Sequence, residues 1–144
     1  MNGSSRDVEA AEDTPLLYVL RNDVGVKSPR FGCGNEQCGA CMVLIDGRVA
    51  YACTTPVSAA LGHQVTTVEG LGSESNPHPI QQALLDEQAA QCGYCLSGIV
   101  IRAAALLAEN PHPDEAAVRA ALDGNLCRCG AHNRIVRAIL GAAR

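Results

Sequence analysis

Eight cysteines in this chain of 144 residues fall into two groups of four, and their spacing points directly to chemistry. The first group reads C-x4-C-x2-C-x11-C, and the second reads C-x2-C-x31-C-x-C. Four thiolates are the ligand set of an iron–sulfur cluster or of a structural zinc ion. The candidate ligands are Cys33, Cys38, Cys41 and Cys53 in the first group, and Cys92, Cys95, Cys127 and Cys129 in the second.

The spacing within each group favours a [2Fe–2S] cluster over the other uses of clustered cysteines. The first three cysteines are spaced as in plant-type ferredoxins, in which a more distant cysteine is the fourth ligand. Structural zinc sites usually combine two short C-x2-C knuckles, which neither group has, and zinc is the main alternative. Disulfides suit small secreted domains, whereas segment 1–14 is polar and acidic and does not have the pattern of a signal peptide. We therefore expect two clusters, which transfer single electrons, in a cytoplasmic protein.

Small residues stand beside and between the cysteines of the first group. A loop that wraps an iron–sulfur core must turn its backbone N–H groups toward the sulfurs, and glycine permits the backbone angles that this requires. A phosphate-binding loop is the alternative for a glycine-rich segment, but neither G-x-G-x-x-G nor Gly-Lys-Ser/Thr occurs here. The small residues are Gly32, Gly34, Gly39 and Ala40.

Composition excludes several classes of partner. The formal net charge is −4 and there is no basic run, which argues against nucleic acid. No apolar run is long enough to span a membrane, so we expect no membrane insertion. Hydrophobic residues make up 47% of the chain but aromatic residues only 3%, so the core must consist of Ala, Leu, Val and Ile. The four histidines, His63, His78, His112 and His132, are interpreted as solvated loop or helix residues rather than ligands.

The elements that must position the cysteines change in character along the chain. Before residue 70 the pattern is mixed, and Asp46-Gly47 is the preferred centre of a two-residue hairpin turn. Thr14-Pro15 predicts the N-cap and first turn of a short helix. The predicted strands are 6–10, 42–45, 48–52 and 65–68, and the predicted helix is 16–21.

Segment 70–79 is rich in Gly, Pro, Ser and Asn and is predicted to be a linker, after which the pattern is helical throughout. The predicted helices are 80–88, 96–109, 114–122 and 133–143. The second cysteine group then lies at junctions between helices and loops. The fold class is α+β, with one domain over residues 1–72 and an all-α domain over 73–144.

These motifs together resemble the iron–sulfur subunit of the xanthine oxidase family of molybdenum hydroxylases. The matching stretches are FGCGNEQCGAC, the YAC that ends at Cys53, VTTVEGL, QCGYC and GNLCRCG. The resemblance covers nearly the whole chain, from residue 7 to residue 139. Within the family, LRND, HPIQQA, DEQAAQC and CRCGAH resemble the branch that contains nicotinate dehydrogenase and isoquinoline oxidoreductase.

The resemblance implies a β-grasp ferredoxin-like domain followed by a four-helix domain, each with one [2Fe–2S] cluster. It implies that the second cysteine group holds the cluster next to a molybdopterin, and that the first group holds the distal cluster. Gln91 matches a glutamine that contacts the pterin, and Cys129 matches a ligand whose sulfur approaches it. Both are therefore candidate cofactor-binding residues.

Three positions depart from the family pattern. The family usually has a full strand before the Asn-Gly of residues 2–3, so either the start is shortened or an edge strand is missing, and the β-grasp sheet is expected to be incomplete here. Glu36 stands where many members have glycine, which puts the backbone conformation of the loop in question. Cys129 is followed by Gly-Ala-His rather than Thr-Gly-Tyr.

The expected function is electron transfer in a molybdenum hydroxylase of an N-heteroaromatic substrate such as nicotinate or a related pyridine. The resemblance implies a large partner subunit with molybdopterin, in its cytosine dinucleotide form, and an acceptor that is a cytochrome (haem) or a flavin (FAD) subunit. No catalytic residues are expected on this chain. The alternatives are the small subunit of an aldehyde or carbon monoxide dehydrogenase, and a free-standing ferredoxin.

Overall fold

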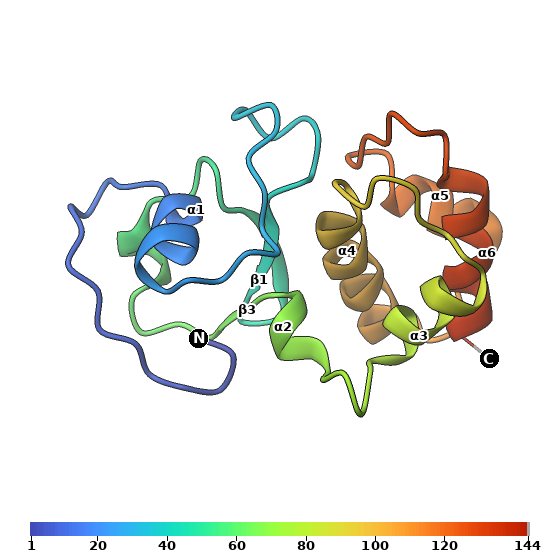
Figure 1. Ribbon diagram of the computed structural model, residues 1–144, viewed down its shortest axis with the longest axis horizontal. Coiled ribbons are helices and arrows are strands. Elements are labelled where there is room, and N and C mark those ends of the chain that lie inside the picture. The colour runs from blue at the N-terminus through green and yellow to red at the C-terminus, as the bar shows by residue number, and fades with distance from the viewer. Residues whose placement is uncertain (144) are drawn as a thin grey trace.

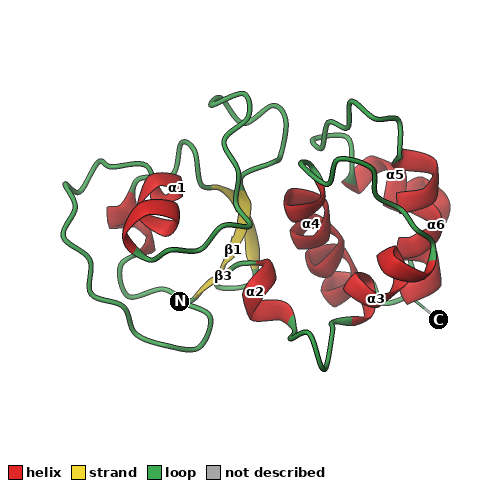
Figure 2. Cartoon of the chain, viewed as in Figure 1, coloured by secondary structure: helices red, strands yellow, loops and turns green. Residues whose placement is uncertain are grey.

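The computed structural model describes residues 1–143 and shows two halves that lie side by side, a loop-rich half with a small sheet and a helical half (Figure 1). Figure 2 shows that all strands belong to the N-terminal half. That half contains α1 (Leu16–Tyr18), η1 (Val19–Asp23), β1 (Met42–Ile45), β2 (Arg48–Tyr51), η2 (Val57–Ala60), β3 (Val65–Thr66) and α2 (Val68–Leu71).

The sheet has the order β2-β1-β3, and both neighbouring pairs are antiparallel. β1 and β2 form the predicted hairpin, with Ile45 opposite Arg48. Asp46 and Gly47, the two turn residues, have φ values of 49° and 79°. A two-residue hairpin turn with positive φ at both positions matches the right-handed twist of the strands, and this is why Asp-Gly predicted it.

Three predictions for this half need correction. Residues 6–10 form no strand: this exposed, charged segment runs around α1 and does not join the sheet, whose strands are β2, β1 and β3 (Figure 1). The strand predicted at 65–68 ends at Thr66, where the backbone turns into α2. The short helix has Pro15, not Thr14, at its N-cap and continues as a π-helical turn to Asp23.

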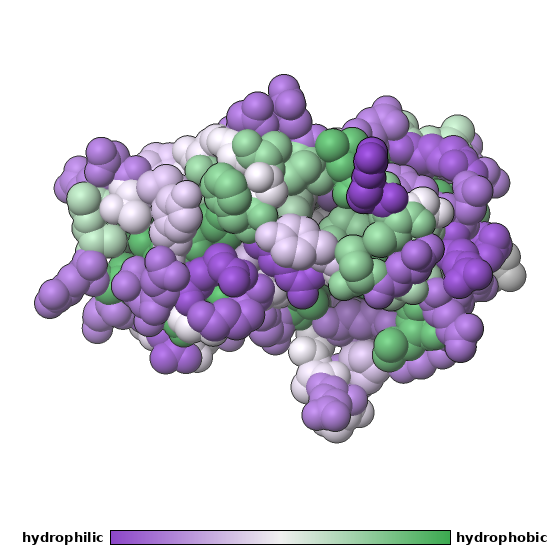
Figure 3. All heavy atoms as spheres, turned by 45° about the horizontal axis from the view of Figure 1, so that its top comes forward, coloured by the Kyte–Doolittle hydropathy of each residue, from purple (hydrophilic) through white to green (hydrophobic). Residues whose placement is uncertain are grey.

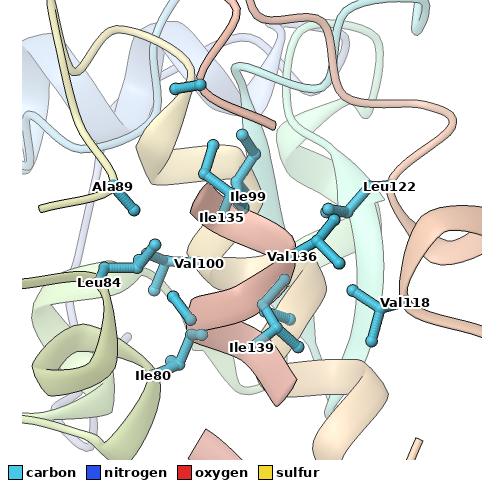
Figure 4. Close-up of a cluster of buried hydrophobic side chains, with 13 residues drawn as sticks. Ile80, Leu84, Ala89, Ile99, Val100, Val118, Leu122, Ile135, Val136 and Ile139 are labelled. Atoms are coloured by element: carbon cyan, nitrogen blue, oxygen red, sulfur yellow. The ribbon is translucent and has the colours of Figure 1, made fainter. Parts of the chain in front are cut away.

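The helical half agrees closely with the prediction. It contains α3 (Pro79–Asp86), α4 (Leu96–Glu109), α5 (Glu115–Ala121) and α6 (His132–Ala142). The side chain of Asp114 caps α5 by accepting a hydrogen bond from Ala117 N–H at 2.7 Å. Aliphatic side chains from all four helices meet in one core, which Figure 4 shows around Ile99 and Ile135.

The two halves are packed directly against each other through α4 and β1. Met42 and Leu44 of β1 form one buried cluster with Ile101 and Ala105 of α4. The side chains in this cluster are all apolar, so the two predicted domains share an apolar interface. No helix in residues 1–143 combines the length and the apolar character needed to cross a membrane.

Candidate metal centres

The loops that carry the cysteines gather at one end of the molecule. Figure 1 shows the light-blue loop of the N-terminal half at the top, beside the yellow loop that precedes α4 and the orange-red loop that precedes α6. These loops contain all the cysteines except Cys53, which follows β2. The fold thus brings the two cysteine groups, which are separated in sequence, to the same end.

Backbone N–H groups in the first loop point at the sulfur of Cys33. The N–H groups of Asn35, Gln37 and Cys38 donate to Cys33 Sγ at 3.5, 3.2 and 3.3 Å. In return, Cys33 N–H donates to Cys38 Sγ at 3.3 Å. Such N–H groups stabilise the thiolate form that binds iron and help to set the potential of a bound cluster. The loop therefore fits the group that its spacing predicts.

Glycine is required where this loop closes on a sulfur. A Cβ atom on Gly32 would lie 2.5 Å from Cys38 Sγ, closer than van der Waals contact allows. Glu36, the departure from the family pattern, adopts the left-handed backbone conformation of a glycine with φ 65°. Its carboxylate accepts a 2.5 Å hydrogen bond from the hydroxyl of Thr54, next to Cys53. The loop conformation is thus kept in spite of the substitution.

Two thiols of the first group, those of Cys33 and Cys41, have very different pKa values. Burial opposes ionisation of Cys33, but the N–H groups that point at its sulfur outweigh burial and lower its pKa to about 7. Cys41 is buried, and burial, together with the neighbouring thiols of Cys53 and Cys38, raises its pKa to about 12. Because a metal ion must displace the proton of each thiol, assembly at this site releases protons.

The second group forms two pairs of cysteines. Cys92 Sγ and Cys129 Sγ are 3.4 Å apart, well beyond the about 2.05 Å of a disulfide bond. Cys95 and Cys127 interact directly: burial first, and then the thiols of Cys127 and Cys92, raise the pKa of Cys95 to about 12. For Cys127, burial opposes ionisation, but the N–H of Ala131 and the Cys95 thiol lower its pKa.

The side chain of Gln91 ties the two loops of the second group together. Its amide Nε2 donates a hydrogen bond to Cys129 O at 2.9 Å, and the residue is exposed. The structure therefore places both candidate cofactor-binding residues, Gln91 and Cys129, at the surface of the second site and in contact with each other.

The way in which the thiols pair distinguishes a [2Fe–2S] cluster from a zinc ion. A [2Fe–2S] cluster divides its four thiolates between two irons, whereas a zinc ion holds all four around one point. The thiols of the second group lie in two pairs, Cys92 with Cys129 and Cys95 with Cys127, which fits a division between two irons. Two of the histidines have other partners: His63 pairs with Asp46, and His78 caps α3.

A short connection joins the two sites, and the sequence did not predict it. Leu126 N–H, next to Cys127, donates to Cys38 O at 3.0 Å. Gly39 packs so tightly between the halves that a Cβ atom on it would lie 2.4 Å from Asn125 Nδ2. Asn125 itself is only 2% exposed. A polar residue next to a ligand loop was the only sequence signal for this contact, and it does not reveal the partner.

Models of two known domain families match the chain. The [2Fe-2S] binding domain matches residues 67–140, and the 2Fe-2S iron-sulfur cluster binding domain matches residues 1–65. One nicotinate dehydrogenase subunit from Pseudomonas putida is 52% identical over 99% of this chain and 91% of that protein. The alpha subunit of isoquinoline 1-oxidoreductase from Brevundimonas diminuta is 48% identical over 100% of this chain and 95% of that protein.

The chain is also similar to a solved structure, that of quinoline 2-oxidoreductase from Pseudomonas putida 86. The TM-score is 0.89 with 36% identity, over 93% of this chain and 84% of that chain. The chain belongs to the iron–sulfur small subunits of the molybdenum hydroxylases. Its two halves are two [2Fe–2S]-binding domains, and this small subunit transfers electrons within a multisubunit oxidoreductase. The expected family, fold class and general function are confirmed.

Proposed function

We propose that this subunit carries electrons from a molybdopterin-binding large subunit, which hydroxylates an N-heteroaromatic compound such as nicotinate, to an external acceptor. A molybdenum cofactor on that partner would supply the hydroxylation chemistry from which the electrons come. The observation that carries the proposal is the placement of two four-thiol sites at one end of the fold, joined by the hydrogen bond from Leu126 N–H to Cys38 O. The substrate class rests on the names of the relatives.

Each site is assigned four ligands by this proposal. The first site uses Cys33 and Cys38, which share N–H···S hydrogen bonds, together with Cys41 and Cys53, which interact with each other. The second site uses the pair of Cys92 and Cys129 and the pair of Cys95 and Cys127. We place the boundary between the domains after residue 72, so that they span residues 1–72 and 73–144.

The second site is proposed to face the large subunit. Figure 3 views the molecule with the cysteine-bearing end turned forward and shows apolar surface across the middle of that face. Tyr94 and Leu126, which adjoin the ligands of the second group, are 50% and 61% exposed. Exposed apolar residues that gather around a site mark a surface that a partner covers. Gln91 and Cys129 are then placed to contact the pterin, proposed to be the cytosine dinucleotide form.

Electrons would enter through the second site and leave through the first. The loop of the first site is exposed at Cys33, which leaves a route to an acceptor, either a cytochrome or a flavin subunit. The proposed location of the complex is the cytoplasm.

Metal analysis tests this proposal. The purified protein should contain about four iron and four acid-labile sulfide per chain and give two distinct S = 1/2 signals on reduction, since the two thiol sets differ in burial. Stoichiometric zinc without visible absorbance would contradict it. The substrate class is tested on the copurified complex. Nicotinate or isoquinoline should reduce both clusters. If benzaldehyde reduced the clusters and neither N-heteroaromatic compound did, the proposed substrate class would be overturned.

Hydrogen exchange tests the proposed orientation. In the assembled complex, residues 91–95 and 127–130 should exchange more slowly than in the isolated subunit, because the large subunit covers them. Residues 34–41 should change less. Protection of residues 34–41 alone, with 91–95 and 127–130 exchanging freely, would reverse the orientation.

A further inference from the structure

Arg30 crosses from the first site to the second. It lies just before the first cysteine of the chain, and its Nη1 donates a hydrogen bond to Gly93 O, between Cys92 and Cys95. Its guanidinium carbon lies 5.3 Å from the centre of the Tyr94 ring, within the range of a cation–π interaction. One side chain thus contacts the loop of the opposite site in two ways.

Tyr94 makes the reciprocal contact. Its hydroxyl donates a hydrogen bond to Phe31 O at 2.5 Å, on the residue that follows Arg30. The guanidinium and the phenol therefore link the same two backbone segments, 30–31 and 93–94, in opposite directions. This link is separate from the contact between Leu126 and Cys38, which joins the first loop to the other ligand loop of the second site.

The charge of Arg30 is not neutralised by a carboxylate. The ion pairs formed in residues 1–143 involve His63, Arg119 and Arg137, and none involves Arg30. The side chain is half-buried, so water screens its charge less than that of an exposed arginine. Arg128, which lies between two ligands of the second group, is exposed, so its charge is screened more strongly.

Position and charge together suggest a role in electron transfer. A four-thiolate cluster gains one negative charge with each electron, and a nearby cation favours that gain. We propose that Arg30 is a positioning residue that holds the 91–95 loop against the first site and favours reduction of the clusters by its charge. This inference rests on the proposed electron-transfer function.

Redox titration followed by EPR tests the charge. Arg30→Gln removes the charge and shortens the side chain that reaches Gly93 O, Arg30→Lys keeps the charge, and Arg48→Gln removes the same charge from the exposed start of β2. At the midpoint potential of the wild-type protein, the ratio of oxidised to reduced second cluster should rise by about threefold or more in Arg30→Gln. It should stay near the wild-type value in Arg30→Lys and Arg48→Gln.

Hydrogen exchange tests the positioning. Tyr94→Phe keeps the ring beneath the guanidinium and removes only the hydrogen bond to Phe31 O. Residues 91–95 should exchange faster in Tyr94→Phe and in Arg30→Gln, and not in Arg48→Gln. Because these substitutions are small, both clusters should be retained, and iron content checks this.

The outcomes separate this inference from the proposed function. If the wild-type protein lacks two cluster signals, the proposed function fails. If both signals are present but Arg30→Gln changes neither the potential nor the exchange of residues 91–95, only the role of Arg30 is overturned. Equal changes of potential in Arg30→Gln and Arg30→Lys would contradict the role of its charge.

Discussion

The absence of a side chain at Gly32 allows the backbone of the first loop to lie close to the sulfur of Cys38. The backbone φ of Gly32 is not in the left-handed region, so conformational freedom is not the reason for glycine here. The reason is space, because a Cβ atom would lie 2.5 Å from Cys38 Sγ. A cluster ligand cannot move aside for a methyl group without leaving its iron.

Replacement of Gly32 by alanine should therefore remove the first cluster and keep the second. The iron content should fall from about four to about two per chain, and one of the two S = 1/2 signals should disappear. Gly141→Ala is the matched control, since a Cβ atom at Gly141 meets nothing within 4 Å. Full iron content in Gly32→Ala would show that the loop relaxes around the methyl group.

At the scale of elements, α4 fixes the distance between the two sites. Gly98, in its first turn, lies against the first-site loop, where an added Cβ atom would be 1.8 Å from Gly39 O. Ser97 adds a hydrogen bond from its hydroxyl to Ala40 O at 3.3 Å. The helix that follows Cys95 is thus seated directly on the loop that carries Cys38 and Cys41.

Gly98→Ala should lower the free energy of unfolding by about 1–3 kcal/mol, because overpacking forces α4 away from Gly39. Weaker magnetic coupling between the two reduced clusters should accompany the loss of stability. In Gly141→Ala the stability should be unchanged or rise by up to about 1 kcal/mol, as alanine favours a helix. Denaturant unfolding measures the stability, and EPR measures the magnetic coupling. Equal stability and equal coupling in Gly98→Ala and Gly141→Ala would contradict this packing.

The start of α3 depends on a neutral histidine. His78 Nδ1 accepts a hydrogen bond from Ile80 N–H at 3.3 Å, and Gln81 Oε1 accepts one from His78 N–H at 2.8 Å. Burial lowers the pKa of His78 below its usual 6.5. The unfolded chain therefore binds this proton more readily than the folded protein does. Stability is full above the unfolded pKa and declines as the pH falls through the lowered folded pKa.

His78→Asn should keep an oxygen acceptor for the cap and remove this pH dependence. Between about pH 7.5 and pH 5.5 the melting temperature of the wild-type protein should fall more than that of the variant, in line with an N-cap contribution of about 0.5–2 kcal/mol. His112→Asn, at an exposed histidine, serves as the control and should behave like the wild type. Identical pH profiles for wild type and His78→Asn would exclude the cap as a titrating contact.

For the whole molecule, the features that could be predicted from the sequence are those that depend on neighbouring residues. The Asp46-Gly47 turn and the limits of α4 follow from local backbone preference and apolar length. Cysteine spacing likewise divided the ligands into two groups. Segment 6–10 was wrongly predicted as a strand, because a strand also needs a partner in the sheet, and this segment does not join the β2-β1-β3 sheet.

The contacts between the halves could not be predicted in this way. Three contacts join residues more than 60 positions apart: the hydrogen bond from Leu126 to Cys38, the packing of Asn125 against Gly39, and the hydrogen bond from Arg30 to Gly93. Local sequence carries no information about which loop a residue meets. The relation between the two sites is therefore a property of the packed molecule.

Electron flow in the assembled complex tests the central proposal most directly. The variants are Cys41→Ser, in the first site, and Cys95→Ser, in the second, each checked for iron content because ligand loss can unfold a domain. Freeze-quench EPR after addition of substrate should show reduction of the second cluster in Cys41→Ser, while transfer to the external acceptor stops. Cys95→Ser should block reduction of the remaining cluster. A Cys41→Ser complex that retains its second cluster but cannot reduce it with substrate would contradict the proposed order of electron transfer.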